Sequence, residues 1–277
     1  MGPDYLSLFL NYPDPQALLL LLFLGFMRMA PIVILAPFFG AKLIPGPVKV
    51  GLIVTLSLIF LPQLMFETPT PLTFTFTYLG YCGKELFIGA IIGFLVSIPF
   101  HMASTSGTLV DHQRGSASLL IFNPALQEQV SPIGLLYNYV LIALFFGFNG
   151  AYYFLDAVST SYTVVPPTTW LNPAFFGGEG QFFWQGMIAV GNDVITVATK
   201  LAAPPLVAML MSDLFLGIAN RMATQVPMAF LGWALKSLVG MVILFLAWFF
   251  ILQQLEKEVF DWLRWITRLI DALLPAQ

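Results

Sequence analysis

Charged side chains are scarce in this sequence: only 9% of its 277 residues are Asp, Glu, Lys or Arg. A water-soluble globular domain carries about a quarter charged residues, so these are too few to cover the surface of a folded body of this size. Because 58% of the residues are hydrophobic, the scarcity excludes a soluble enzyme and also a disordered or fibrous chain. We therefore predict a single integral membrane or membrane-complex domain.

Other absences narrow the function. The formal net charge is −3 without any basic run, so we expect no nucleic-acid partner. Cys82 is the only cysteine, which excludes an internal disulfide and a cysteine-based metal cage. His101 and His112 are too few for a metal centre of their own, so we predict no metal and no cofactor. The familiar phosphate-binding, zinc-protease and serine-hydrolase motifs are missing, which leaves a membrane enzyme as the weakest alternative.

What the chain has in abundance is long apolar runs. Six of them predict an all-α, membrane-type fold of helical hairpins, because a spanning helix needs about 20 apolar residues. They cover approximately residues 17–39, 50–66, 86–110, 135–155, 186–211 and 237–252.

Prolines interrupt several of these runs. Pro31, Pro62, Pro99 and the Pro204-Pro205 pair lie inside them, and proline removes a backbone donor and clashes with the preceding turn. We expect Pro62 to limit the second helix to residues 50–61, which fits a re-entrant arm or a buried helix better than a full span. Broken helices persist only where protein or water surrounds them, so we expect burial against neighbouring subunits. An ordinary polytopic protein with kinked spans is the alternative.

The end of the chain differs in character. Over residues 253–274, apolar and charged side chains recur on two faces at steps of three and four, which predicts an amphipathic helix on a membrane surface or a partner helix. We therefore divide the chain into a hydrophobic domain, residues 1–252, and an amphipathic C-terminal helix, residues 253–277.

Charges inside the apolar runs are the first candidates for functional residues, because a charge at a helix centre usually faces protein or water. Arg28 is either an interhelical partner or the lining of an aqueous path. Asp213, Gly217 and Arg221 share one helical face, where the glycine permits close approach of another helix. A helix or subunit interface is the favoured interpretation of this face, and a proton relay is the alternative. Lys84 and Glu85 open the third run and fit a boundary position.

The segment 107–132 differs from its surroundings. Charged and amide side chains, including Asp111, Gln113 and Arg114, flank an apolar centre at residues 119–122. Gly115 and the Asn123-Pro124 pair supply turn residues. This mixture suits a constriction, where apolar side chains exclude water and polar ones fix the loop. A plain connecting loop is the alternative.

These residues resemble the SctT/FliR family of type III secretion export proteins in three blocks that keep the family order. The first contains Gly107, Asp111, Gln113, Arg114, Gly115, Pro124, Gln127, Gln129, Ser131, Pro132, Ile133 and Gly134. The second contains Ala202, Ala203, Pro204, Asp213, Gly217, Arg221, Gln225, Lys236, Ser237 and Gly240. The third contains Arg28, Pro31, Ala36, Pro37, Phe38, Pro45, Lys49 and Gly51. The segments 41–43 and 210–217 look closest to injectisome SctT proteins of the chlamydial type.

The resemblance implies a non-enzymatic structural and gating subunit that helps to line and plug a protein-export channel. It implies assembly with SctR-, SctS- and SctU-like subunits above an SctV ring, in the bacterial inner membrane at the base of a secretion system. Exported unfolded proteins would be the cargo and membrane lipid a further contact. The family's bent hairpins pack together in a helical export-gate assembly.

The resemblance also implies residue roles. Subunit or helix contacts would fall to Arg28, Asp213, Gly217, Arg221 and Lys236. The channel plug would comprise Asp111, Gln113, Arg114, Gly115, Leu119, Leu120, Ile121, Phe122 and Pro124, with the polar members as anchors and residues 119–122 as apolar gate contacts. The rival hypothesis is a secondary transporter with Arg28, Asp213 and Arg221 as coupling charges.

Overall fold

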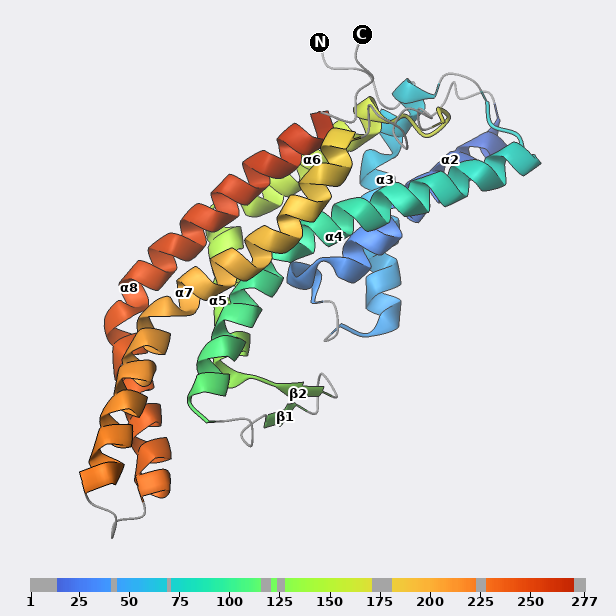
Figure 1. Cartoon of the computed structure of the whole chain (residues 1–277). Coiled ribbons are helices and arrows are strands. Elements are labelled where there is room, and N and C mark those ends of the chain that lie inside the picture. The colour runs from blue at the N-terminus through green and yellow to red at the C-terminus, as the bar shows by residue number, and fades with distance from the viewer. Residues whose placement is uncertain are drawn as a thin grey trace. The chain divides into compact units, whose positions relative to one another are not determined.

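The computed structural model describes residues 14–40, 44–68, 71–115, 121–123, 128–170, 181–222 and 228–271 (Figure 1). In chain order the elements are α2 (Pro15–Leu35), the short 3₁₀ helix η1 (Pro37–Phe39), α3 (Gly46–Glu67), α4 (Phe76–Gln113), β1 (Ile121–Asn123), β2 (Glu128–Val130), α5 (Pro132–Gly147), α6 (Gly150–Val164), α7 (Gln181–Met222) and α8 (Met228–Asp271).

The predicted all-α, membrane-type fold is confirmed. Within the described ranges, five helices are long and apolar enough to cross a membrane, or six if α5 and α6 together count as one broken span. They match the six apolar runs of the sequence. The fold also contains one feature that the sequence did not predict, a short antiparallel pair of strands, β1 and β2.

The chain folds into two compact units. The first contains residues 1–97, 149–188 and 263–277, and the second contains residues 98–148 and 189–262. The boundaries between the units fall inside α4 after Ser97, between α5 and α6 after Phe148, inside α7 after Ile188 and inside α8 after Trp262. Asn149 has a positive φ of 58°, an uncommon conformation that asparagine tolerates better than most residues and that does not continue a helix. The apolar run 135–155 is therefore interrupted at an asparagine, which its apolar composition did not predict.

In the first unit, α2 and α3 pack against each other and α3 contacts α6. The ends of α2 follow from its sequence. The Asp14 carboxylate accepts a hydrogen bond from the Gln16 amide at 2.9 Å, with Pro15 at the first helical position. At the other end, Ala36 is extended before Pro37, as the residue before a proline prefers to be.

The prolines that we expected to break the helices within the apolar runs lie inside continuous helices instead. Pro31, Pro62, Pro99 and the pair Pro204-Pro205 all lie inside helices. The prediction that Pro62 limits its helix to residues 50–61 is wrong, because α3 extends over 22 residues, which is about 33 Å. A proline removes one intrahelical hydrogen bond, and within an apolar helix the remaining bonds and the packing of residues on both sides can maintain the helix. The side chains of Leu61 and Leu64 beside Pro62 are buried.

In the second unit, residues 189–222 of α7 and residues 228–262 of α8 lie antiparallel and contact each other (Figure 1). A β-carbon added to Gly240 would contact the Met209 side chain, and one added to Gly232 would contact Leu216. At a second contact in this unit, the rings of Phe100 on α4 and Phe145 on α5 meet edge to face, with centroids 5.9 Å apart.

The single helix α8 continues through the division that we predicted between residues 252 and 253, and that division stays a prediction. The amphipathic pattern is visible in the part whose side chains the structure describes: Leu255, Val259 and Trp262 are buried, whereas Lys257 and Asp261 are exposed.

Candidate functional site

Arg28 lies where two helices of the first unit cross. A β-carbon added to Gly89 of α4 would overlap the carbonyl group of Arg28 on α2. The missing side chain therefore lets the two backbones touch. Glu85 precedes Gly89 by four residues, one turn away on the same face of α4, which brings its carboxylate to the Arg28 guanidinium. Both side chains are fully buried.

All three nitrogens of the Arg28 guanidinium donate hydrogen bonds to this chain. Nε and Nη2 donate to the two oxygens of Glu85 at 2.5 and 2.9 Å, the bidentate geometry that makes arginine–carboxylate pairs strong. Nη1 donates to the backbone oxygen of Ser161 at 2.7 Å, and Nη2 donates to that of Val165, also at 2.7 Å. The guanidinium also lies 4.1 Å from the centre of the Tyr162 ring, a cation–π contact.

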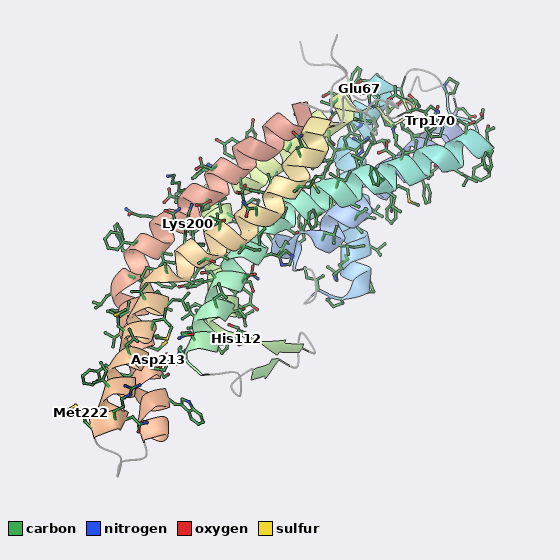
Figure 2. The ribbon with its side chains drawn as sticks, in the orientation of Figure 1. Glu67, His112, Trp170, Lys200, Asp213 and Met222 are labelled. Atoms are coloured by element: carbon green, nitrogen blue, oxygen red, sulfur yellow. The ribbon has the colours of Figure 1, made fainter. Side chains whose placement is uncertain are left out.

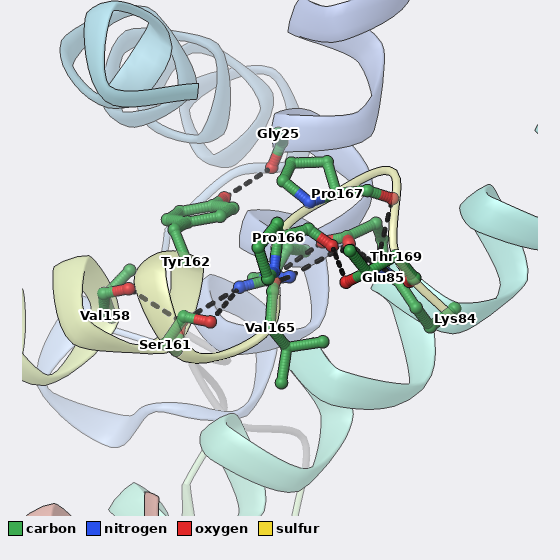
Figure 3. Close-up of polar contacts among 11 residues, drawn as sticks. Gly25, Lys84, Glu85, Val158, Ser161, Tyr162, Val165, Pro166, Pro167 and Thr169 are labelled. Atoms are coloured by element: carbon green, nitrogen blue, oxygen red, sulfur yellow. Dashed lines mark hydrogen bonds and ion pairs between the residues drawn. The ribbon is translucent and has the colours of Figure 1, made fainter. Parts of the chain in front are cut away.

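Lys84 holds the turn that follows α6 in place. Its Nζ lies 2.8 Å from Glu85 and donates to the backbone oxygens of Pro166, Pro167 and Thr169 at 2.7, 3.0 and 3.0 Å (Figure 3). The two prolines expose carbonyl groups and have no N–H, so this turn offers acceptors that a buried cation can use. We call Arg28, Lys84 and Glu85 the Arg28 cluster.

The Arg28 cluster holds two cations and one carboxylate with side chains at most 3% exposed. Backbone oxygens from the C-terminal end of α6 and the residues after it offset the excess positive charge, with help from the negative end of the helix dipole. The arrangement ties α2, α4 and α6 together.

A second polar group lies in the second unit, at the end of α4. The buried Asp111 carboxylate accepts hydrogen bonds through Oδ2 from the Ser131 hydroxyl at 2.5 Å and from the Ile133 amide at 2.9 Å. Ser131 is the N-cap of α5 and itself accepts from the Gly134 amide at 3.0 Å. Asp111 thus joins the end of α4 to the start of α5, and a carboxylate at a helix N-terminus is electrostatically favoured.

Arg114 extends these contacts to α8. Its Nη1 lies 3.2 Å from Asp111 Oδ1, and its Nη2 donates to the Ser237 hydroxyl at 2.9 Å. We call Asp111, Arg114, Ser131 and the Ile133 amide the Asp111 clamp. It fixes both ends of the segment 115–130.

The spacing of the Gly107–Asp111 motif now has a physical explanation. A β-carbon on Gly107 would overlap the backbone of Ile133 and Gly134, so the glycine permits contact between α4 and α5. Asp111 lies one turn later and caps α5. A glycine and a carboxylate four residues apart therefore meet the start of one neighbouring helix.

Asp213 on α7 forms the third polar contact. Its Oδ2 lies 2.8 Å from the Lys236 ammonium of α8 and 3.3 Å from the Gln113 amide nitrogen of α4. Figure 2 shows Asp213 on α7 and His112 at the end of α4. The Asp213 side chain is 40% exposed, so this pair contributes less to stability than the buried Arg28 cluster.

The other two members of the predicted contact set lie at the surface. Gly217 and Arg221 are exposed, and a β-carbon on Gly217 would meet nothing within 4 Å. Close approach of another helix at Gly217 is therefore not made by the described residues. Nor do those residues contain a group of three His, Cys, Asp or Glu side chains that could hold a metal ion.

Some of the predicted plug residues lie at the end of α4, some lie in β1, and the others lie outside the residues that the structure describes. Asp111 and Gln113 belong to α4, and Gly115 follows it with a positive φ of 82°, the left-handed conformation typical of a glycine after a helix. Ile121 and Phe122 belong to β1, opposite Val130 and Gln129 of β2. Leu119, Leu120 and Pro124 lie outside the described residues.

The sequence identified the buried charged residues Arg28 and Asp111 but not the residues that pair with them. The position of Lys84 and Glu85 at the start of an apolar run predicts a helix boundary, whereas both residues are buried. The signal that could have found them is Gly89, one turn after Glu85 within an apolar helix. Ser131 and Ser237 were part of the family blocks but had no predicted role.

The sequence is similar to known proteins over most of its length. Residues 19–261 match the family described as Bacterial export proteins, family 1. Yop proteins translocation protein T of Yersinia pestis is 32% identical over 217 residues, covering 78% of this chain and 80% of the relative. Secretion system apparatus protein SsaT of Salmonella typhimurium is 30% identical, covering 62% and 64%. Flagellar biosynthetic protein FliR of Pectobacterium carotovorum is 26% identical, covering 86% and 89%.

Both secretion and flagellar relatives match over most of their length, and the family match includes α3 to α7 completely. The likeness to the chlamydial type stays a prediction. Family members are structural subunits of export apparatus and not enzymes. This chain belongs to the bacterial export protein family 1, the SctT/FliR family.

Proposed function

We propose that this chain is a structural and gating subunit of a type III protein-export gate, and that the segment 115–130 plugs the export channel. The observation that supports the plug best is the Asp111 clamp, because one buried carboxylate fixes both ends of that segment. A fixed base with an apolar centre at residues 119–122 is what a removable barrier to water requires.

In this proposal the partners are SctR-, SctS- and SctU-like subunits and the SctV ring, in the bacterial inner membrane. Unfolded exported proteins pass through the channel, and this chain transforms no substrate. The exposed apolar side chains on α7 and α8 support a place in a membrane or a membrane complex, because such surface is covered by lipid or by other protein.

The rival secondary transporter needs charges that can bind and release an ion. Arg28 does not fit that role well, since all three nitrogens of its guanidinium donate to acceptors within the chain. Asp213 is held by Lys236 and Gln113. We therefore favour the export-gate subunit.

Two preparations test the proposal against this rival. The chain reconstituted alone in liposomes should move no solute down an ion gradient, whereas the chain expressed with SctR- and SctS-like subunits should co-purify with them in one complex. Ion-coupled solute uptake by the chain alone, or its purification without those subunits, would contradict the proposed function.

A further inference from the structure

One face of α8 in the second unit contacts the end of α4, where the segment 115–130 begins. We call it the α8 face. It consists of Trp233 and of Lys236, Ser237 and Gly240, which follow Trp233 by three, four and seven residues. This spacing places side chains on one side of an α-helix. Three consecutive residues at the end of α4, 113–115, contact this face or its ion-pair partner Asp213.

Trp233 lies against Gly115, the first residue of the segment. A β-carbon added to Gly115 would be 3.5 Å from Cδ1 of the indole ring, an ordinary van der Waals distance. Gly115 has a positive φ of 82°, so it sets the direction in which the chain leaves α4. Trp233 is 62% exposed and is therefore not a core residue. It touches the segment at the point where its direction is set.

Arg114, the residue before Gly115, is held by the same face. Its Nη2 donates to the Ser237 hydroxyl at 2.9 Å. A β-carbon added to Gly240 would lie 3.4 Å from Cγ of Arg114, so the missing side chain of Gly240 leaves room for the stem of the arginine. The α8 face thus gives Arg114 a polar partner for its guanidinium and a surface for its stem.

Gln113 completes the set through α7. Its Nε2 donates to Oδ2 of Asp213 at 3.3 Å, and the same oxygen lies 2.8 Å from Nζ of Lys236. Residues 113, 114 and 115 are therefore held one after another. The last turn of a helix lacks part of its backbone hydrogen bonds, so side-chain contacts of this kind govern how firmly the following chain is directed.

We propose that the α8 face positions the plug, with Trp233 and Ser237 as positioning residues. The Asp111 clamp attaches the segment 115–130 to α4 and α5, and the α8 face fixes its direction where it starts. Without the contacts to α8 the segment would keep its attachments and leave its closed position more often. The proposal rests on the proposed function, because it takes this segment to be a plug, and it goes further in naming the helix that holds the plug closed.

The permeability of cells that carry the complete apparatus tests this role. The readout is the entry of a small charged dye that an intact membrane excludes. Trp233→Ala and Ser237→Ala should each raise dye entry about fivefold, the change in an equilibrium constant expected for the loss of one such contact, while the complex still co-purifies. Leu238→Ala is the matched control and should leave dye entry unchanged, because Leu238 is 63% exposed and lies about 100° around the helix from Ser237.

Conservative variants separate positioning from a merely structural role, which would lower the amount of complex and not its permeability. Ser237→Thr keeps the hydroxyl, and Trp233→Phe keeps a ring carbon at the contact with Gly115, so both should retain low dye entry. Raised dye entry with these variants as well would overturn the assignment of the contacts. If Trp233→Ala reduces the amount of complex, Ser237→Ala decides, because it removes a single oxygen atom.

Removal of residues 115–127 distinguishes this proposal from the proposed function. If the removal raises dye entry but neither Trp233→Ala nor Ser237→Ala does so in an intact complex, the α8 face does not position the plug and the proposed function stands. If the removal leaves dye entry unchanged in an intact complex, the plug itself is refuted.

Discussion

Arg28 and Asp111 show how a chain with few charges uses them. Each side chain is buried, and each contacts several groups from other elements of its own unit. A buried charge that loses its partner is strongly destabilising, because its desolvation is no longer compensated. At both positions the loss of free energy of unfolding should therefore exceed that at the exposed charges which the structure describes.

Replacing Arg28 with methionine should lower the free energy of unfolding of the purified subunit by about 3–5 kcal/mol, because Glu85 and the carbonyl groups of Ser161 and Val165 lose their donors. Denaturant unfolding in detergent measures this. Lys257→Met, at an exposed site, is the control and should stay within about 0.5 kcal/mol. Adding Glu85→Gln to Arg28→Met should cost less than the sum of the two single changes; additive costs would show that the pair is not coupled.

Replacing Asp111 with alanine should free the Ile133 amide and the Ser131 hydroxyl, at a cost of about 1–3 kcal/mol. Hydrogen exchange should report it locally: the amide of Ile133 should exchange faster, whereas amides in the middle of α2 should not change. Asp261→Ala, on the exposed face of α8, serves as the comparison. Unaltered protection at Ile133 would mean that the Asp111 clamp does not hold the start of α5.

The sequence predicted these residues better than their partners. Arg28 and Asp111 were conspicuous because they are charged within or beside apolar runs. Glu85 was not, because a charge near the end of a run also fits a membrane boundary, and its partner is 57 residues away. Such pairings depend on which helices cross, and local composition carries little information about crossing.

At the scale of helices, apolar composition predicted where they occur but not where they end. Pro62 leaves α3 intact, whereas the helix breaks at Asn149 inside the apolar run 135–155. Proline costs a helix one hydrogen bond that packing can offset. A residue in the left-handed backbone conformation changes the direction of the chain and so ends a helix. A single asparagine in the sequence is only a weak signal for that conformation.

The contact between α4 and α5 depends on the missing side chain of Gly107. Gly107→Ala should destabilise the subunit by about 1–3 kcal/mol, because the added methyl group overlaps the backbone of Ile133 and Gly134. Thermal unfolding of the purified subunit measures the change. Gly191→Ala is the matched control, since a β-carbon there meets nothing within 4 Å, and alanine favours a helix by about 0.5–1 kcal/mol. Equal effects of the two changes would contradict the close approach.

At the scale of the whole molecule, the chain carries much apolar surface that it does not bury itself. Side chains such as Phe245 on α8 and Phe215 on α7 are 79% and 67% exposed. By contrast, the charged residues Arg28 on α2 and Glu85 on α4 have no exposed surface. The sequence did not predict this division, because it assigned Arg28 and Asp213 alike to subunit or helix contacts. It could not specify which exposed faces meet lipid and which meet other subunits, because both covers favour the same apolar residues.

The proposed role of the segment 115–130 in the assembled apparatus is to close the export channel. The permeability of cells that express the complete apparatus with residues 115–127 removed tests this role, with co-purification of the other subunits as the control for assembly. Small-solute leakage should rise while the complex remains intact. An intact complex with unchanged leakage would contradict it.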